Sequence, residues 1–226
     1  MIPAITRQQM VEVDRLMIDE LGITLTQMME NAGLQLARLT VDRYDAGSVM
    51  VLAGSGGNGG GGLVAARRLA SWGVDVHVAL TRPNLEGVPG AQLSILRSMG
   101  VLIGEPRAAD LIIDSVIGYS LVGAARGRAE TFIEWANDEA IPVLALDTPS
   151  GVDVDTGLAP GAGIYADATL TLALPKVGLI DSNHAGELFV ADISIPALVY
   201  ERLGVSVAAD LFRRGSIQPV FDDQGR

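Results

Sequence analysis

The sequence contains no cysteine and only two histidines, and aromatic residues make up 4% of its 226 residues. The absence of cysteine excludes disulfide bonds, zinc–thiolate sites and a cysteine nucleophile. Basic residues are also scarce, because 16 Lys and Arg stand against 27 Asp and Glu, for a net charge of −11. Nonspecific binding to nucleic acid or to anionic membranes depends on a basic surface, so we expect neither kind of partner. An anionic ligand would have to be held locally.

No hydrophobic run is long enough to cross a membrane, and the amino terminus lacks a basic cluster followed by an apolar core. Together with the lack of cysteine, this predicts a soluble, cytoplasmic protein. Hydrophobic residues make up 49% of the chain, which is enough for one well-filled core at this length. We therefore expect residues 1–226 to form a single domain.

Glycine is abundant in one place, because seven glycines lie between positions 54 and 62 around Asn58. An apolar run of strand length precedes them, and apolar residues at helical spacing follow from Leu63. A tight turn needs only one or two glycines, so we interpret the segment as a ligand-binding loop. Its backbone N–H groups, with a helix that begins near Gly62, would hold a phosphate. The alternative is a turn whose glycines only provide positive φ angles.

Strands and helices alternate along most of the chain. Two amphipathic helices come first, one capped by Thr6 and one that begins at Thr24 or Thr26. Strands are predicted at 49–53, 74–80, 111–113, 142–146, 167–174 and 186–191, with helices at 63–72, 91–99 and 130–139. This alternation predicts an α/β fold with a mainly parallel sheet.

Two polar residues interrupt the second helix. Glu30 and Asn31 stand in the otherwise apolar segment 28–33. Either they are solvated, as polar residues on a helix commonly are, or they pack over the glycine segment and bind its backbone.

Polar residues also follow directly after several predicted strands, where ligands of parallel sheets gather. They are Asp114, Asp147 with Ser150 close behind, and Lys176. Carboxylates and hydroxyls without histidine suit a hard cation rather than zinc or copper. The alternatives are that Asp114 caps a helix, that segment 147–157 is an Asx-type turn, and that Lys176 is a surface residue.

Several motifs, in order from about Thr6 to Pro196, resemble the YjeF N-terminal domain, the family of NAD(P)H-hydrate epimerases. They are MMENAG at 28–33, the glycine segment with Asn58, DSVIG at 114–118, DTPSG at 147–151 with Asp153 and Gly157, Asp167 with Thr169, PK at 175–176 and ADISIP at 191–196. The resemblance implies a three-layer α/β/α Rossmann-like sandwich with two N-terminal helices, assembled as a homodimer. It also implies an enzyme that interconverts the R and S forms of hydrated NADH and NADPH, NAD(P)HX. A separate dehydratase then restores the cofactor from the S form, and we expect no fused dehydratase domain in this chain.

The resemblance assigns site residues by position. Asp147 and two segments would bind the substrate, and Asn58, Asp114 and Ser150 would hold one potassium ion per subunit. The two substrate segments are Gly57, Asn58, Gly59, Gly60 and Gly61, and Gly118, Tyr119, Ser120, Leu121, Val122, Gly123 and Ala124. The reaction calls for general acid–base catalysis, and our hypothesis gives this to Asp147, helped by Lys176 as a donor or as a cation that tunes it.

Two positions depart from the family's usual loop, GNNGGDG. Gly57 replaces the first asparagine and Gly61 replaces the aspartate, which removes a polar anchor or proton carrier. The alternative function is therefore a catalytically impaired relative that serves as a nucleotide-binding, dimerisation or scaffold module. An ordinary NAD-dependent dehydrogenase is disfavoured, because Leu80-Thr81-Arg82 ends the second strand without an acidic residue to hold a ribose. Arg82 would instead favour a phosphorylated cofactor, with a solvent-exposed loop arginine as the alternative.

Overall fold

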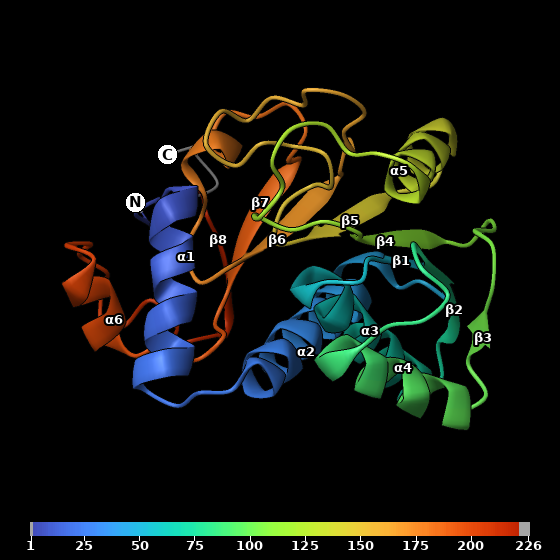
Figure 1. The fold of residues 1–226 in the computed structure, drawn as a ribbon, viewed down its shortest axis with the longest axis horizontal. Coiled ribbons are helices and arrows are strands. Elements are labelled where there is room, and N and C mark those ends of the chain that lie inside the picture. The colour runs from blue at the N-terminus through green and yellow to red at the C-terminus, as the bar shows by residue number, and fades with distance from the viewer. Residues whose placement is uncertain (1, 222–226) are drawn as a thin grey trace.

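The protein is built around one eight-stranded sheet, seen in a computed structural model that describes residues 2–221 (Figure 1). The strand order is β3-β2-β1-β4-β5-β6-β7-β8, and within the described residues β8 alone pairs antiparallel to its neighbour. The strands are β1 (Ser48–Ala53), β2 (Asp75–Leu80), β3 (Leu102–Ile103), β4 (Leu111–Ser115), β5 (Val143–Leu146), β6 (Ala168–Leu172), β7 (Glu187–Ala191) and β8 (Ile217–Pro219).

Helices cover both faces of the sheet, as Figure 1 shows, with α2, α3 and α4 on one face and α5 on the other. The helices are α1 (Arg7–Arg15) with a π-helical turn η1 (Leu16–Glu20), α2 (Leu25–Tyr44), α3 (Gly57–Ser71), α4 (Gly87–Ser98), α5 (Arg128–Asp138), the 3₁₀ turn η2 (Val177–Leu179) and α6 (Ala197–Arg202). The predicted fold class, a three-layer α/β/α sandwich with a mainly parallel sheet, is confirmed.

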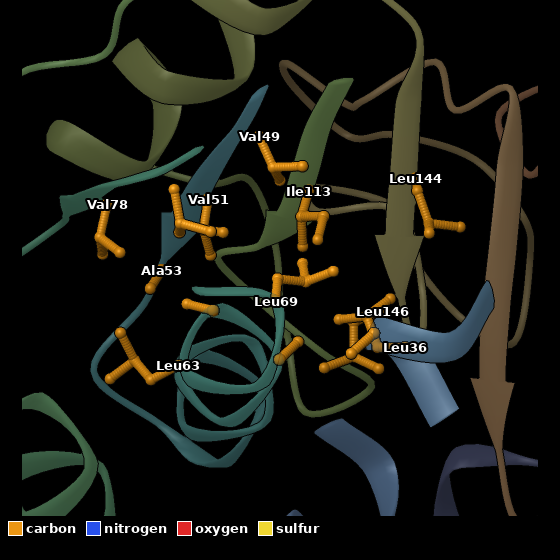
Figure 2. Packing of buried hydrophobic residues seen from close by; sticks show 14 of the residues in the cluster. Leu36, Val49, Val51, Ala53, Leu63, Leu69, Val78, Ile113, Leu144 and Leu146 are labelled. Carbon is orange, nitrogen blue, oxygen red and sulfur yellow. The ribbon is translucent and has the colours of Figure 1, made fainter. Parts of the chain in front are cut away.

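The two faces of each strand supply two separate cores, because successive side chains of a strand point to opposite sides. Val51, Ile113 and Leu146 face α2 and α3, where they meet Leu36, Leu63 and Leu69 (Figure 2). Met50, Leu52 and Ile112 face α5 and meet Phe132 and Ile133. Burial of each such aliphatic side chain stabilises the fold by about 1.5–3 kcal/mol.

The two N-terminal helices start where the sequence predicts. Thr6 caps α1 and Thr24 caps α2, and each threonine forms a capping box with the glutamine three residues later. Thr24, rather than Thr26, is therefore the N-cap. The side chains of α1, η1 and α6 form a further apolar cluster beyond the end of β6.

The glycine segment differs from the prediction, because α3 begins at Gly57 rather than near Gly62. None of the glycines from 54 to 62 has a positive φ angle, so a turn does not explain them. They allow close packing instead. A Cβ atom on Gly59 would lie 2.0 Å from the Gly54 carbonyl oxygen, and one on Gly62 would lie 1.9 Å from Ser115 Oγ. Close packing is therefore the main structural reason for these glycines, and neither the ligand-loop nor the turn interpretation includes it.

Other elements also differ from the sequence interpretation. Helix α4 begins at Gly87 rather than at position 91, and β3, α6 and β8 were not predicted. The partly exposed Glu30 does not bind the glycine backbone, because its carboxylate accepts hydrogen bonds from Arg67, Arg68 and Gln92. Asn31 donates to the Ile193 carbonyl at 3.4 Å.

Within residues 2–221, no helix combines the length and the apolar character that crossing a bilayer requires.

Candidate active site

A cavity of about 800 Å³ opens at the carboxyl edge of the parallel strands. One part of its wall comes from α1, η1 and α2, and most of the rest comes from the segments that follow β1, β2, β4 and β5. Leu172 of β6 and Ile193 after β7 complete it. Its volume lies within the range of small-molecule sites, and its place agrees with the rule for ligands of open parallel sheets.

The cavity wall includes some of the predicted substrate residues and excludes others. Gly57, Asn58, Gly61, Gly118, Tyr119, Ser120 and Asp147 line it. Gly59 and Gly60 are buried in the first turns of α3, away from the wall. Leu121, Val122, Gly123 and Ala124 also lie outside the lining, and Val122 is 82% exposed. The first half of segment 118–124 therefore faces the cavity and the second half does not.

Asp147 has the most constrained position in the wall. It follows β5 with a φ of 67°, a conformation that costs about 1–3 kcal/mol for a residue other than glycine and clusters at functional sites. Its backbone N–H donates to the Leu170 carbonyl at 2.8 Å. One carboxylate oxygen accepts from the Tyr119 N–H at 3.0 Å, and the other accepts from Lys176 Nζ. The carboxylate is thus fixed from two sides.

Lys176, the only lysine in the sequence, is fully buried behind Asp147 and does not line the cavity. It also donates to Thr171 Oγ1 at 3.0 Å and to the Leu172 carbonyl at 2.9 Å, so all three of its N–H bonds are used. The surface alternative for Lys176 is wrong. Its place favours holding Asp147 over giving a proton to a ligand, because no face of the ammonium group is open to the cavity.

Asp114 and Ser150 lie together at the ends of β4 and β5, and both are fully buried. The Asp114 carboxylate accepts from Ser150 Oγ at 2.6 Å and from the Ser150 N–H at 2.7 Å. Burial raises the pKa of Asp114 to about 6, although the hydrogen bonds from Ser150 and Val116 act in the opposite direction. No helix follows Asp114 directly, so the helix-cap alternative is wrong.

Asn58 lies beside Asp147, with Gly118 between them. A Cβ atom on Gly118 would lie 3.2 Å from Asn58 Cγ and 3.1 Å from Asp147 Oδ2. Both polar atoms of the Asn58 side chain are buried, and neither has a hydrogen-bond partner among residues 2–221. Buried amides are almost always paired, so this one is a candidate ligand contact.

The described part of the chain has no group of three or more His, Asp or Glu side chains that could hold a metal ion. A cation at this edge would therefore need a mixed set of carboxylate, amide and hydroxyl oxygens. Asn58, Asp114 and Ser150 offer one oxygen of each kind.

The later part of segment 147–157 is an Asx-type turn, as the alternative interpretation of this segment predicts. Asp153 Oδ1 accepts from the N–H groups of Asp155 at 3.1 Å and Thr156 at 3.0 Å. Asp153 also forms an ion pair with Arg7 and so anchors α1.

Sequence reasoning missed Asp14, which extends from α1 into the cavity wall. Its carboxylate accepts a 2.5 Å hydrogen bond from the Tyr119 hydroxyl. Asp14 stands four residues after the buried Met10, which places it on the helix face that turns inward. That spacing is the signal that could have identified it. Arg82 and Arg126 also line the cavity.

Comparison with known proteins adds independent information. Residues 25–178 match the family described as "YjeF-related protein N-terminus". The NAD(P)H-hydrate epimerase of Dehalogenimonas lykanthroporepellens is 46% identical, over 90% of this chain and 87% of that protein. The NAD(P)H-hydrate epimerase of Rhodopirellula baltica is 33% identical, over 90% and 89%.

Two further similarities concern a longer relative and a solved structure. The bifunctional NAD(P)H-hydrate repair enzyme Nnr of Moorella thermoacetica is 37% identical over 85% of this chain, which spans 40% of that enzyme. The crystal structure of yeast ynu0, YNL200c, superposes with a TM-score of 0.83 over 96% of this chain and 100% of that one. At 24% identity it shows that the fold is shared.

Proposed function

Because the chain belongs to the YjeF-related N-terminal family, we propose that it is an NAD(P)H-hydrate epimerase, an isomerase that interconverts the R and S forms of hydrated NADH and NADPH. The names of relatives at 46% and 33% identity over most of the chain support this. The observation that carries the proposal is the fixed Asp147 carboxylate in the wall of a cavity large enough for such a ligand.

The reaction inverts one ring carbon that bears a hydroxyl group next to a ring nitrogen. This needs a group that takes a proton and a group that gives one, and it needs no redox residue. We propose Asp147 as the base, since its carboxylate lines the cavity and can only accept hydrogen bonds when ionised. Lys176 is then a positioning residue, because it neutralises and orients the carboxylate from behind.

The N-terminus of α3 is the proposed site for the substrate's pyrophosphate. Gly60 is the first residue whose N–H closes a helical bond, to the Gly56 carbonyl at 3.0 Å, so the N–H groups before it are free of the helix ladder. Gly57 and Asn58 from this turn line the cavity. Such a terminus favours an anion through its free N–H groups and its dipole.

We further propose one potassium ion held by Asn58, Asp114 and Ser150. The buried, unpartnered Asn58 amide and the buried Asp114 carboxylate support a cation, and the all-oxygen donor set suits a hard one. When bound, the ion would offset negative charge of the substrate near the start of α3.

The rival function, a catalytically impaired nucleotide-binding or scaffold module, rests on Gly61. A Cβ atom there would lie 2.8 Å from Leu146 Cδ2, so position 61 packs against the sheet as well as lining the cavity. Glycine at this position therefore also has a packing role, and an epimerisation assay separates the two functions.

The test is to incubate the pure R-hydrate with the protein and to follow the S form by chromatography against buffer alone. We expect the protein to accelerate epimerisation and Asp147→Asn to lose about 10²- to 10⁴-fold, the usual contribution of a general base. Asp153→Asn is the matched control, because that carboxylate lies in the same segment outside the cavity lining. An inactive wild-type protein would favour the scaffold function, whereas an active Asp147→Asn variant would refute the role of Asp147.

Several expectations about the protein's surroundings stay predictions. We propose that it works with a separate NAD(P)HX dehydratase, which the bifunctional repair enzyme among its relatives supports. The homodimer, the cytoplasmic location and the single domain over residues 1–226 are likewise proposals. Light scattering after size exclusion tests the dimer directly.

A further inference from the structure

The cavity needs a proton donor that its proposed base cannot supply. Lys176, the obvious partner of Asp147, is 0% exposed and lies outside the lining, so it cannot touch a ligand. Among the described residues, Asp14 and Asp147 are the acidic side chains in the wall. They come from different elements, Asp14 from α1 and Asp147 from the end of β5.

Tyr119 links these two carboxylates. Its hydroxyl donates to Asp14 Oδ2 at 2.5 Å, and its backbone N–H donates to Asp147 Oδ2 at 3.0 Å. Tyr119 also lines the cavity, and the side chain is half-buried. Tyr119 therefore joins the proposed base, Asp147, to Asp14, which lies 105 positions before Tyr119 in the chain.

Asp14 is held firmly in this place. Met10, Val13 and Met17 on the same helix are buried in the apolar cluster that includes Leu174. Just before the helix, the N–H of Ile5 donates to the Pro175 carbonyl at 2.8 Å, and the Ile5 carbonyl accepts from Val177 at 3.0 Å. The chain that carries Asp14 thus pairs with the segment around Lys176, and the two carboxylates are fixed relative to each other.

The surroundings of Asp14 let it keep its proton to a higher pH than a free aspartate does, because its pKa is raised. Burial raises the pKa of Asp14, the hydrogen bond from Tyr119 lowers it, the Asp147 charge raises it and the Lys176 charge lowers it, and the net direction is upward. Burial also raises the pKa of Tyr119 far above its ordinary value, and Asp14 adds to this, so the phenol does not lose its proton on its own. A tyrosine beside a protonatable carboxyl can pass a proton on while it receives one.

We propose that Asp14 and Tyr119 form the proton relay that acts as general acid in this site, with Asp14 as the source of the proton and the Tyr119 hydroxyl as the group that delivers it. The relay rests on the proposed epimerase function. It assigns to these two residues the role that the buried Lys176 cannot fill.

In the hydrated ring, the relay takes part in the loss and the return of the hydroxyl group. The bond from carbon to the hydroxyl oxygen breaks, the lone pair of the ring nitrogen forms a carbon–nitrogen double bond, and Tyr119 gives its proton to the leaving oxygen, which departs as water. For this step the hydroxyl hydrogen of Tyr119 turns from Asp14 to the leaving oxygen, and the protonated Asp14 donates to the Tyr119 oxygen. Tyr119 takes the Asp14 proton as it gives up its own, so that Asp14 ends as a carboxylate. Water then adds to the other face, the double-bond pair returns to nitrogen, and Asp147 takes the extra proton. Proton exchange from Asp147 to Asp14 completes the cycle.

A double-mutant cycle tests the relay. Asp14→Asn keeps an oxygen that can accept from Tyr119 but carries no acidic proton, and Tyr119→Phe removes the hydroxyl alone. We expect each single variant to lower kcat about 100-fold with KM changed less than about threefold, as loss of a general acid does. The double variant should lose no more than either single one, because the two residues act as a unit.

Different results identify different failures. If the wild-type protein epimerises the hydrate and Asp14→Asn keeps its kcat, or if the losses multiply in the double variant, the relay is wrong while the function stands. If only Tyr119→Phe loses activity, Tyr119 acts without Asp14, which also overturns the relay. A wild-type protein that does not epimerise overturns both. Asp153→Asn serves as the control for changes around α1, because Asp153 anchors that helix through Arg7 away from the cavity.

Discussion

At the scale of single residues, the buried pair of Lys176 and Asp147 dominates the site. The exposed fraction of the two side chains is 0% and 5%. Breaking a buried ion pair from one side leaves an uncompensated charge.

We expect Lys176→Met to lower the free energy of unfolding by about 3–5 kcal/mol, because Asp147 would stay buried without its counter-charge. Chemical denaturation measures the loss. Arg7→Met, which removes a partly exposed ion pair with Asp153, should cost about 1 kcal/mol or less. Equal losses in the two variants would show that Asp147 is not held by Lys176.

Asp14 gives a second prediction, with the opposite sign. Its pKa is raised in the folded protein, chiefly by burial, so its contribution to stability is complete below the unfolded value, about 3.9, and is lost as the pH rises through the folded value. Asp14→Asn has no carboxyl group to titrate at this position, so the variant does not lose this stability as the pH rises. The variant should therefore melt like the wild type near pH 4 and at an equal or higher temperature at pH 7.

Thermal unfolding at the two pH values measures this difference. If Asp14 were a purely structural carboxylate, the result would be the reverse. Asp14→Asn would then be destabilised, relative to the wild type, more at pH 7 than at pH 4. A polar group that costs stability and faces a cavity is typical of a functional site.

At the scale of elements, α3 shows how tertiary packing overrides helix propensity. Its first six residues are glycine apart from Asn58, although glycine costs about 1 kcal/mol relative to alanine inside a helix. The close approach of α3 to β1, β4 and α2 compensates for this, because no Cβ atom fits at several positions.

Gly62→Ala should therefore lower the free energy of unfolding by about 1–3 kcal/mol, the usual cost of overpacking. The new methyl group would lie 1.9 Å from Ser115 Oγ, and Ser115 is fixed by its hydrogen bond to the Leu52 carbonyl at 2.8 Å. Gly57→Ala in the same helix is the control, since its nearest contact would be 3.8 Å away, at Met29 Cε. If Gly62→Ala stabilised the protein as helix propensity alone requires, the packing explanation would fail.

The elements that could be predicted are those with a local signal. Thr6 and Thr24 mark the starts of α1 and α2 through their caps, and the apolar runs mark the parallel strands. The short elements β3, α6 and β8 carry no such signal, and β8 exists only because it pairs with β7. The start of α3 was missed because a run of glycine predicts a loop, and the contacts that make it helical come from Met29 and Ser115, far away in sequence.

The site divides in the same way. Asp114 and Asp147 could be identified because polar residues at the ends of parallel strands meet at one edge. The roles of Asp14 and Lys176 depend on how deeply each side chain is buried in the fold, and this cannot be predicted from the sequence. Asp14 looks like a solvated helix residue until the structure places it in the cavity wall. For Lys176 the sequence leaves both a helper of Asp147 and a surface lysine open, until the structure places it beneath Asp147.

At the scale of the whole molecule, a chain with a net charge of −11 has to hold a negatively charged substrate. The start of α3, Arg82 and Arg126 provide positive potential at the cavity, and the proposed potassium ion would add to it.

Potassium should therefore stabilise the folded protein, by about 2.7 kcal/mol at a concentration one hundred times its Kd. Thermal unfolding in potassium chloride and in choline chloride at equal ionic strength separates binding from screening. Asn58→Leu should abolish the difference between the two salts, whereas Asp153→Asn should keep it. Identical melting curves of the wild type in both salts would contradict the cation site.

The most direct test of the whole account starts from each pure isomer of the hydrated nucleotide in separate reactions and follows both by chromatography. We predict that the wild-type protein brings the R and the S form to one common mixture much faster than buffer does, and that Asp147→Asn does so about 10²- to 10⁴-fold more slowly than the wild type. A wild-type protein that leaves both isomers to change at the rate seen in buffer would contradict it.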